Sequence, residues 1–166
     1  MDLFNEKIVK KDYEIKDFLF VIGVVLAGFI LIYATLLTGM PMLVPIVITG
    51  AGYGMFRLIP NVSIEYEYIV TNGDLDIDKI IAKRKRVRIF AGESKDFEII
   101  AKVNSERFTG EYKGITNKIE AVSNMKAENV YFLVTMYKGN RIIVYFEPNE
   151  RMLQDIRKKS PGKVFM

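Results

Sequence analysis

The chain contains no cysteine and no histidine among its 166 residues. The absence of cysteine excludes disulfide bonds and thiol nucleophiles, and without either residue the chain has no zinc site of the Cys/His type. Histidine is also the commonest general acid or base, so any catalysis would depend on carboxylates, lysines or tyrosines. A chain without disulfides fits a reducing compartment.

Charge is missing from one long part of the chain. Between Asp17 and Arg57 lie 39 residues without a single Asp, Glu, Lys or Arg. A helix that crosses a bilayer needs about 20 apolar residues, so this segment is too long for one span and long enough for two. Gly39 and Pro41 break the run near its middle. The sequence therefore predicts a transmembrane hairpin over residues 18–58, with helices at 18–37 and 41–58.

The flanks of this hairpin predict its orientation. Four lysines precede the first helix and Arg57 follows the second, whereas the loop between them has no charge. Under the positive-inside rule both ends lie in the cytoplasm, which describes a multi-pass protein of the cytoplasmic membrane with cytoplasmic N- and C-termini. A cleaved signal peptide is disfavoured, because the apolar run is longer than the usual ~7–15 residues.

Residues 1–17 are interpreted as a cytoplasmic amphipathic lead-in. Phe4, Ile8 and Ile15 fall near one face of a helix, with lysines around them. Such a segment either lies along the inner membrane surface or serves only the charge rule for insertion.

Beyond residue 60 apolar and polar residues alternate, which is typical of strands. Residues 63–80 alternate around Asn72-Gly73, and this dipeptide is the strongest short-range signal for a hairpin. A two-residue turn pairs Val70 with Leu75, Tyr68 with Ile77, and Glu67 with Asp78. One face is then apolar, and the other carries Glu65, Glu67, Asp76 and Asp78.

The remaining segments complete an α+β membrane protein. Further strands are predicted at 96–103, 118–124, 129–137 and 141–147, and a helix at 148–159, where apolar residues recur at helical spacing. The predicted fold is thus the transmembrane hairpin followed by a mainly antiparallel β domain, residues 62–166. About seven short strands form its sheet or barrel, and the C-terminal helix closes it.

The basic stretch IAKRKRVRIF, residues 81–90, follows the acidic hairpin after a very short break. If it pairs with residues 74–80, side-chain alternation places one set of its cations beside the carboxylates. Two interpretations stay open, since the cations either offset the acidic face or contact anionic lipid headgroups. The candidate lipid contacts are Lys83, Arg84, Lys85, Arg86 and Arg88.

Two stretches carry a resemblance to a known fold. YEYIVTNGDLDIDKIIAKRKRVRIF (residues 66–90) and VYFEPNERMLQDIRKKSP (residues 144–161) resemble the first strands and the last strand and helix of the pleckstrin-homology-like (PH-like) fold. The whole chain resembles an uncharacterised family of small two-span membrane proteins with a bacterial PH-like cytoplasmic domain. The resemblance implies a fold and a membrane attachment, and it assigns no function.

No motif indicates catalysis. The spacing of Asp74, Asp76 and Asp78 lacks the Gly and Glu of a calcium loop, and phosphate-loop, dinucleotide and nucleophile-elbow signatures are missing. We therefore expect a non-enzymatic protein without cofactor or metal. Only Phe90 accompanies the basic run, which disfavours nucleic acid as a partner. The sequence predicts a membrane-anchored interaction module for a protein partner or self-assembly, with anionic lipid binding through residues 83–88 as the alternative.

Overall fold

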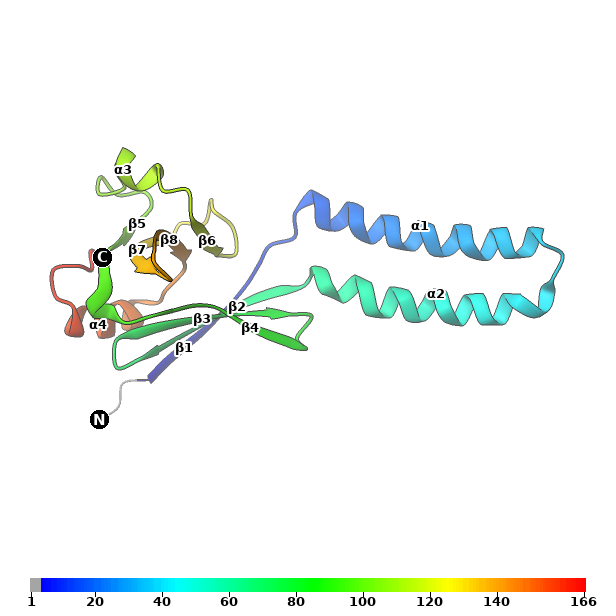
Figure 1. Cartoon of the computed structure of the whole chain (residues 1–166), viewed down its shortest axis with the longest axis horizontal. Helices are drawn as coiled ribbons and strands as arrows, with labels where there is room; N and C mark the ends of the chain where they lie inside the picture. The colour runs from blue at the N-terminus through cyan, green and yellow to red at the C-terminus, as the bar shows by residue number, and fades with distance from the viewer. Residues whose placement is uncertain (1–3) are drawn as a thin grey trace.

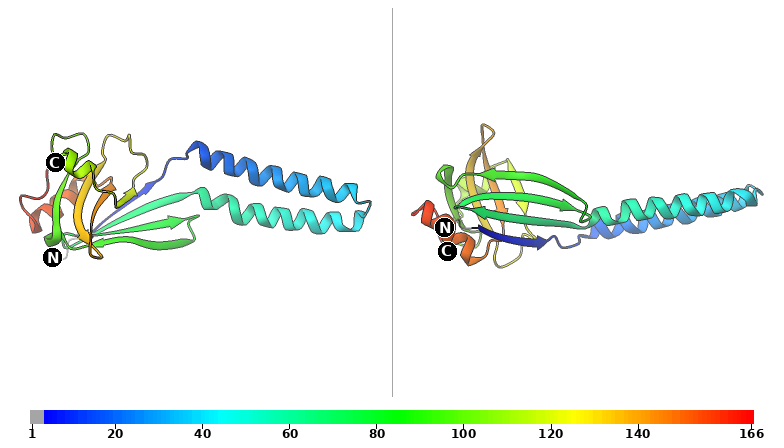
Figure 2. Two further views of the ribbon diagram at one scale, coloured as in Figure 1. Left: turned by 45° about the horizontal axis from the view of Figure 1, so that its top comes forward. Right: turned by 90° about the horizontal axis from the view of Figure 1, so that it is seen from below.

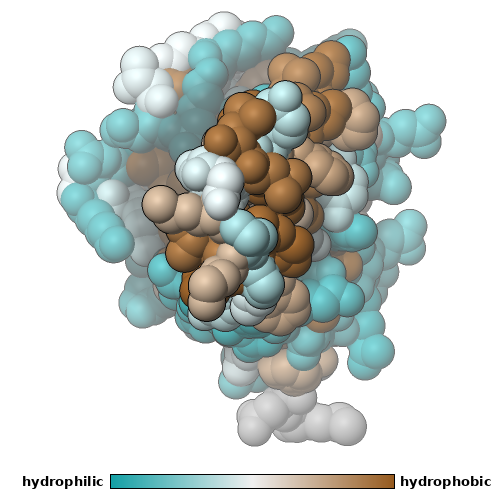
Figure 3. Space-filling model, turned by 90° about the vertical axis from the view of Figure 1, so that its right-hand side faces the viewer, coloured by the Kyte–Doolittle hydropathy of each residue, from teal (hydrophilic) through white to brown (hydrophobic). Residues whose placement is uncertain are grey.

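In the computed structural model, which describes residues 4–166, two long helices project side by side from one end of a β domain (Figure 1). Helix α1 spans Ile15–Leu37 and α2 spans Val44–Leu58, with short 3-10 helices at Pro41–Leu43 and Ile59–Val62 flanking α2. Both helical segments are long and apolar enough to cross a membrane. Most of their side chains are exposed and only Gly28 is buried, and Figure 3 shows the apolar surface at the hairpin end.

The first sheet contains four antiparallel strands in the order β1-β2-β3-β4. Three of these strands are β2 (Ile64–Thr71), β3 (Asp74–Ile81) and β4 (Lys85–Gly92). The register predicted around Asn72-Gly73 is confirmed, because Tyr68 pairs with Ile77 and Glu67 with Asp78. The basic stretch also pairs antiparallel with β3, although a bulge shifts the register between Ile77 and Asp78.

Part of the predicted N-terminal lead-in is strand β1, Phe4–Lys10, so the interpretation of these residues as an amphipathic helix is wrong. Strand β1 pairs with β2 over its full length, from Phe4 opposite Thr71 to Lys10 opposite Glu65. Val9 is buried in the main core, whereas Ile8 faces outward and is exposed. A strand presents alternate residues to one face, so the helical spacing of Phe4, Ile8 and Ile15 had no structural counterpart. Residues 1–3 of the lead-in lie outside the described residues.

The second sheet has the order β5-β7-β8-β6, with strands β5 (Phe97–Lys102), β6 (Lys118–Ala121), β7 (Tyr131–Tyr137) and β8 (Asn140–Phe146). Strand β6 pairs in parallel with β8, whereas β7 runs antiparallel to β8. The sheet is therefore mixed. Residues 62–166 contain seven strands, β2 to β8, as predicted, and β1 adds an eighth from before the helical hairpin.

The main core lies between the two sheets and is closed by helix α4, Glu150–Lys159 (Figure 2). Asn149 caps α4 by accepting a hydrogen bond from the Met152 N–H at 2.8 Å. Met152, Leu153 and Ile156 are buried, as the helical spacing predicts. A second apolar cluster covers the other face of the second sheet, beneath the segment that contains the short helix α3, Gly110–Lys113.

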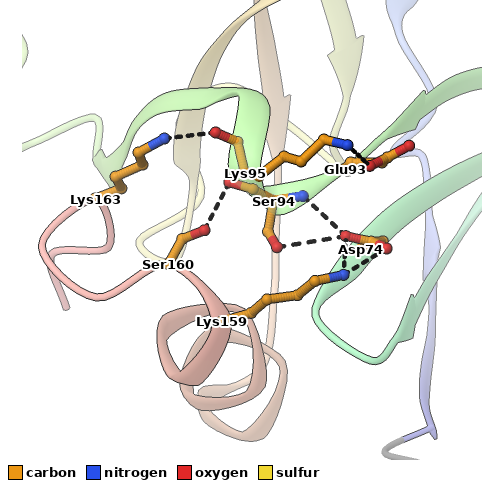
Figure 4. A network of polar contacts seen from close by, with 7 residues as sticks. All are labelled: Asp74, Glu93, Ser94, Lys95, Lys159, Ser160 and Lys163. Atoms are coloured by element: carbon orange, nitrogen blue, oxygen red, sulfur yellow. Dashed lines mark hydrogen bonds and ion pairs between the residues drawn. The ribbon is translucent and has the colours of Figure 1, made fainter.

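Polar contacts fix the end of α4 to the first sheet (Figure 4). Asp74 accepts hydrogen bonds from the Ser94 N–H at 2.9 Å and from the Lys159 ammonium at 2.8 Å, while the Ser160 hydroxyl donates to the Ser94 carbonyl at 2.7 Å. Partial burial opposes the ionisation of Asp74, but the Lys159 and Ser94 hydrogen bonds outweigh it and lower the pKa of this carboxyl. This network holds α4 at the end of the domain away from the hairpin.

The helical hairpin is inserted between two neighbouring strands of one sheet. Strand β1 ends four residues before α1, and β2 begins soon after α2. Because β1 and β2 pair along their whole length, both feet of the hairpin are held at the same end of the β domain.

Candidate functional site

The five basic residues singled out in the sequence divide into two groups. Arg86 and Arg88 reach across the outer face of the first sheet to its acidic residues. Arg86 contacts Glu67 at 2.8 Å, and Arg88 contacts Asp76 at 2.6 Å and also donates a hydrogen bond to Asp78. These two arginines therefore offset part of the negative charge on the acidic face of the sheet.

The acidic face is unusual because two of its carboxylates are buried. Burial, together with the nearby carboxylates of Glu6 and Asp78, raises the pKa of Glu67 despite the Arg86 contact. One oxygen of Glu67, Oε2, is buried without a hydrogen-bond partner within the described part of the chain. Hydrogen bonding to Asp78, and the charges of Asp76 and Asp78, raise the pKa of Arg88. Arg88 thus stays protonated beside these two carboxylates.

The second group is Lys83, Arg84 and Lys85, at the tip of the β3–β4 hairpin. Lys83 and Arg84 belong to the turn, and β4 begins only at Lys85, which corrects the prediction of one basic strand over residues 83–88. Ala82 and Lys83 both have positive φ, 53° and 55°, in a turn closed by the Arg84 N–H to the Ile81 carbonyl at 3.0 Å. Turns with two positive φ angles favour Asn-Gly at these positions. Ala82 and Lys83 both carry a Cβ, so the backbone of this turn is strained.

The turn lies at the foot of helix α2. The Ala82 N–H donates to the Ser63 carbonyl at 2.8 Å, and the Arg84 guanidinium lies 5.9 Å from the centre of the Phe56 ring. Between the turn and the helix is a hollow of about 360 Å³, which we call the basic pocket. Its lining residues are Arg57, Leu58, Asn61, Ile81, Ala82, Arg84 and Lys85.

The cations of the basic pocket have no compensating carboxylates. Within residues 4–166, no ion pair involves Arg57, Arg84 or Lys85. Lys83 approaches Glu65 only to 3.9 Å and remains 77% exposed. A contact this long from an exposed lysine contributes little, so the positive charge at the tip of the hairpin is only weakly offset.

A second hollow, of about 400 Å³, lies where the chain enters α1, and its two lysines are matched by three carboxylates. Glu14 lies there between Lys11, at 2.6 Å, and Lys16, at 2.7 Å. Hydrogen bonds from Lys11 and Lys16 lower the pKa of Glu14 to about 2. The excess of positive charge is therefore a property of the α2 foot and not of both feet.

The sequence interpretation missed Arg57 and Asn61 as pocket residues. The signal was present in the register, because a hairpin that pairs residue 71 with 74 also pairs residue 64 with 81. The next turn must then lie beside residues 61–63, directly after the apolar segment. The β3–β4 turn is consequently brought against the residue that ends the charge-free run.

Comparison with known proteins defines the family of the chain. No curated protein and no solved structure matches it. The model of the family described as "Bacterial PH-like domain (DUF6106)" matches residues 1–166, the full length. Two sheets closed by a C-terminal helix are consistent with that description. The chain therefore belongs to the family of bacterial PH-like domains.

Proposed function

We propose that this protein is a membrane-anchored, non-enzymatic interaction module. Helices α1 and α2 cross the cytoplasmic membrane out and back, and the PH-like domain is held at its cytoplasmic face. The basic pocket then contacts the anionic headgroups of the inner leaflet and orients the domain against the bilayer.

The pairing of β1 with β2 supports two spans. Both strands belong to one sheet, so residues before and after the hairpin must lie on the same side of a membrane. That requirement allows only an even number of crossings. The same pairing disfavours a cleaved signal peptide, because cleavage after α1 would remove strand β1 from the sheet. The lysines before α1 and Arg57 after α2 favour the cytoplasm as the shared side under the positive-inside rule.

The threonine hydroxyl groups within the helical hairpin are also suited to a lipid environment. The Thr35 hydroxyl donates to the Leu31 carbonyl and the Thr49 hydroxyl donates to the Pro45 carbonyl, each at 2.8 Å. Hydrocarbon offers no hydrogen-bond partners, so such internal bonds are what a spanning helix needs.

The main support for a headgroup contact is the position of the unpaired cations. Arg57 lies in the last turn of α2, and the β3–β4 turn brings Arg84 and Lys85 to the same level. Each cation near an anionic membrane surface contributes about 1 kcal/mol, and the effect acts only within a Debye length. A turn at the foot of α2 meets that condition.

A partner strand added to the sheet is the second candidate. Strand β4 pairs only with β3 within residues 4–166, so its outer edge is open. Lysines and arginines on an edge strand usually oppose such pairing, and β4 begins with Lys85-Arg86. The charge of β4 therefore favours a lipid surface over an added strand.

A fluorescent probe near the turn tests the headgroup contact in the full-length protein. The chain has no cysteine, so Val87→Cys on exposed β4 gives a single site for a dye that is quenched by headgroup spin-labelled lipid. In nanodiscs we expect stronger quenching with phosphatidylglycerol than with phosphatidylcholine. The difference should fade as salt rises from about 0.1 M to about 1 M, where the Debye length falls from about 10 Å to about 3 Å.

Two triple variants complete the test. Lys83→Gln, Arg84→Gln and Lys85→Gln together should abolish the difference between the lipids. Lys113→Gln, Arg151→Gln and Arg157→Gln remove the same charge from exposed positions on α3 and α4, far from the hairpin (Figure 1), and should preserve it. Equal quenching in both lipids, or equal loss in both triples, would reject the headgroup contact.

A further inference from the structure

Helices α1 and α2 leave a groove between them, with a volume of about 270 Å³. The helices are in close contact at Gly28, where a Cβ would lie 2.1 Å from the Met55 methyl group. Beside that contact, Gly50 and Gly54 line the groove and have nothing within 4 Å of where a Cβ would be, so the groove is open at both positions. Its walls are apolar and include Val24, Leu31 and Leu58.

The groove adjoins the basic pocket. Leu58 lines both hollows. Gly54, Leu58 and Asn61 follow one another at intervals of four and three residues, so they lie along one face of the chain as it leaves the helix. From Gly50 to Leu58 the groove extends about 12 Å along α2 at about 1.5 Å per residue. An apolar channel thus leads to three uncompensated cations.

We infer that the pocket and the groove together bind one anionic phospholipid molecule. The phosphate lies among Arg57, Arg84 and Lys85, and an acyl chain lies along Gly50 and Gly54. This inference rests on the proposed function. It adds to a general electrostatic attraction a defined site that holds both the headgroup and an acyl chain of one lipid. The direction agrees with the bilayer, because the groove leads from the α2 foot toward the hairpin end, as an acyl chain does from its headgroup.

Charge complementarity favours lipid over a second copy of the chain in the groove. A symmetric contact between two copies places the same surface of each against the other. The unpaired cations of both α2 feet would then approach one another and repel. A phospholipid instead brings the opposite charge to the pocket and a flexible apolar chain to the groove.

Native mass spectrometry of the full-length protein tests this site. Delipidated protein in detergent is mixed with phosphatidylglycerol or with phosphatidylcholine, and the lipid retained per chain is counted. We expect one retained phosphatidylglycerol and little phosphatidylcholine. Gly54→Leu fills the groove without touching the pocket and should weaken retention at least about tenfold, equivalent to about 1.4 kcal/mol. Gly52→Leu is the matched control, because Gly52 is equally open but does not line the groove.

The outcomes separate this inference from the proposed function. Arg84→Gln with Lys85→Gln should remove the preference for phosphatidylglycerol. If Gly54→Leu retains as much lipid as Gly52→Leu, or if it instead abolishes a dimer mass, the lipid site is wrong. In both cases the response of the dye on the Val87→Cys variant to anionic nanodiscs still decides the headgroup contact independently.

Discussion

Glu67 and Asp78 lie opposite each other in the β2–β3 ladder, and both are buried, with 3% and 4% of their surface exposed. Like charges in directly opposed positions destabilise a sheet. Arg86 and Arg88 extend from the edge strand over this pair and offset its charge. The basic stretch therefore has two roles, since its strand residues stabilise the sheet and its turn residues remain available for a ligand.

Arg88→Gln tests the structural role. The change leaves the buried Asp78 carboxylate without its cation, and breaking a buried pair in this way costs about 3–5 kcal/mol. Arg88 is 44% exposed, so we expect a smaller loss, about 1–2 kcal/mol in the free energy of unfolding. Lys85→Gln, in the same strand, should change it by less than about 0.5 kcal/mol. Urea unfolding followed by circular dichroism measures both, and equal effects would contradict the division of roles.

Glu67→Gln tests the buried carboxylate. Its pKa in the folded state is raised above the ordinary value of 4.5, so the folded protein holds this proton more tightly than the unfolded chain does. Stability then falls as the pH rises from about 4.5 through the folded pKa. Glutamine lacks this titration and offers an amide that can donate to the neighbouring Glu6.

We therefore expect Glu67→Gln to be more stable than the wild type at neutral pH, by about 1 kcal/mol. The advantage should shrink as the pH is lowered toward 4.5. Glu106→Gln, at an exposed loop position, is the control and should show no such trend. A stability difference that is independent of pH would refute the raised pKa.

Paired substitutions in β1 separate a strand from a membrane-surface helix. Val9 is 8% exposed and Ile8 is 52% exposed. Val9→Ser removes buried methyl groups and introduces a hydroxyl into the core, so it should cost about 2 kcal/mol or more. Ile8→Ser should be nearly neutral. Thermal unfolding of the two variants in detergent would show the reverse order if Ile8 were an apolar anchor on a helix.

The elements predictable from sequence were those with strong local periodicity. The Asn72-Gly73 hairpin, its register and the helix around Met152 and Ile156 follow from alternation, turn residues and helical spacing. Strand β1 was missed because its partner, β2, is separated from it by the whole apolar hairpin. Seven residues with only Val9 in the core carry too weak a pattern to distinguish strand from helix.

Only part of the candidate site was predictable from the sequence, because the rest depends on contacts between distant segments. Charge density located Lys83, Arg84 and Lys85, but not which cations turn toward the acidic face. That division depends on the bulge where β4 pairs with β3 and on the turn at Ala82-Lys83, neither of which composition indicates. Arg57 enters the site only through tertiary contact of the turn with α2.

The proposed function depends on a two-span anchor that holds the PH-like domain on the cytoplasmic side. Single cysteines can locate the hairpin tip and the β domain relative to the membrane, since the chain has none of its own. Met42→Cys lies at the hairpin tip and Met136→Cys lies in β7, and both native side chains are exposed. Spheroplasts that produce one variant or the other are treated with a membrane-impermeant maleimide before and after permeabilisation. With two spans and a cytoplasmic domain, we expect labelling of the Met42→Cys variant in intact spheroplasts and of the Met136→Cys variant only after permeabilisation. Labelling of the Met136→Cys variant in intact spheroplasts would contradict this arrangement.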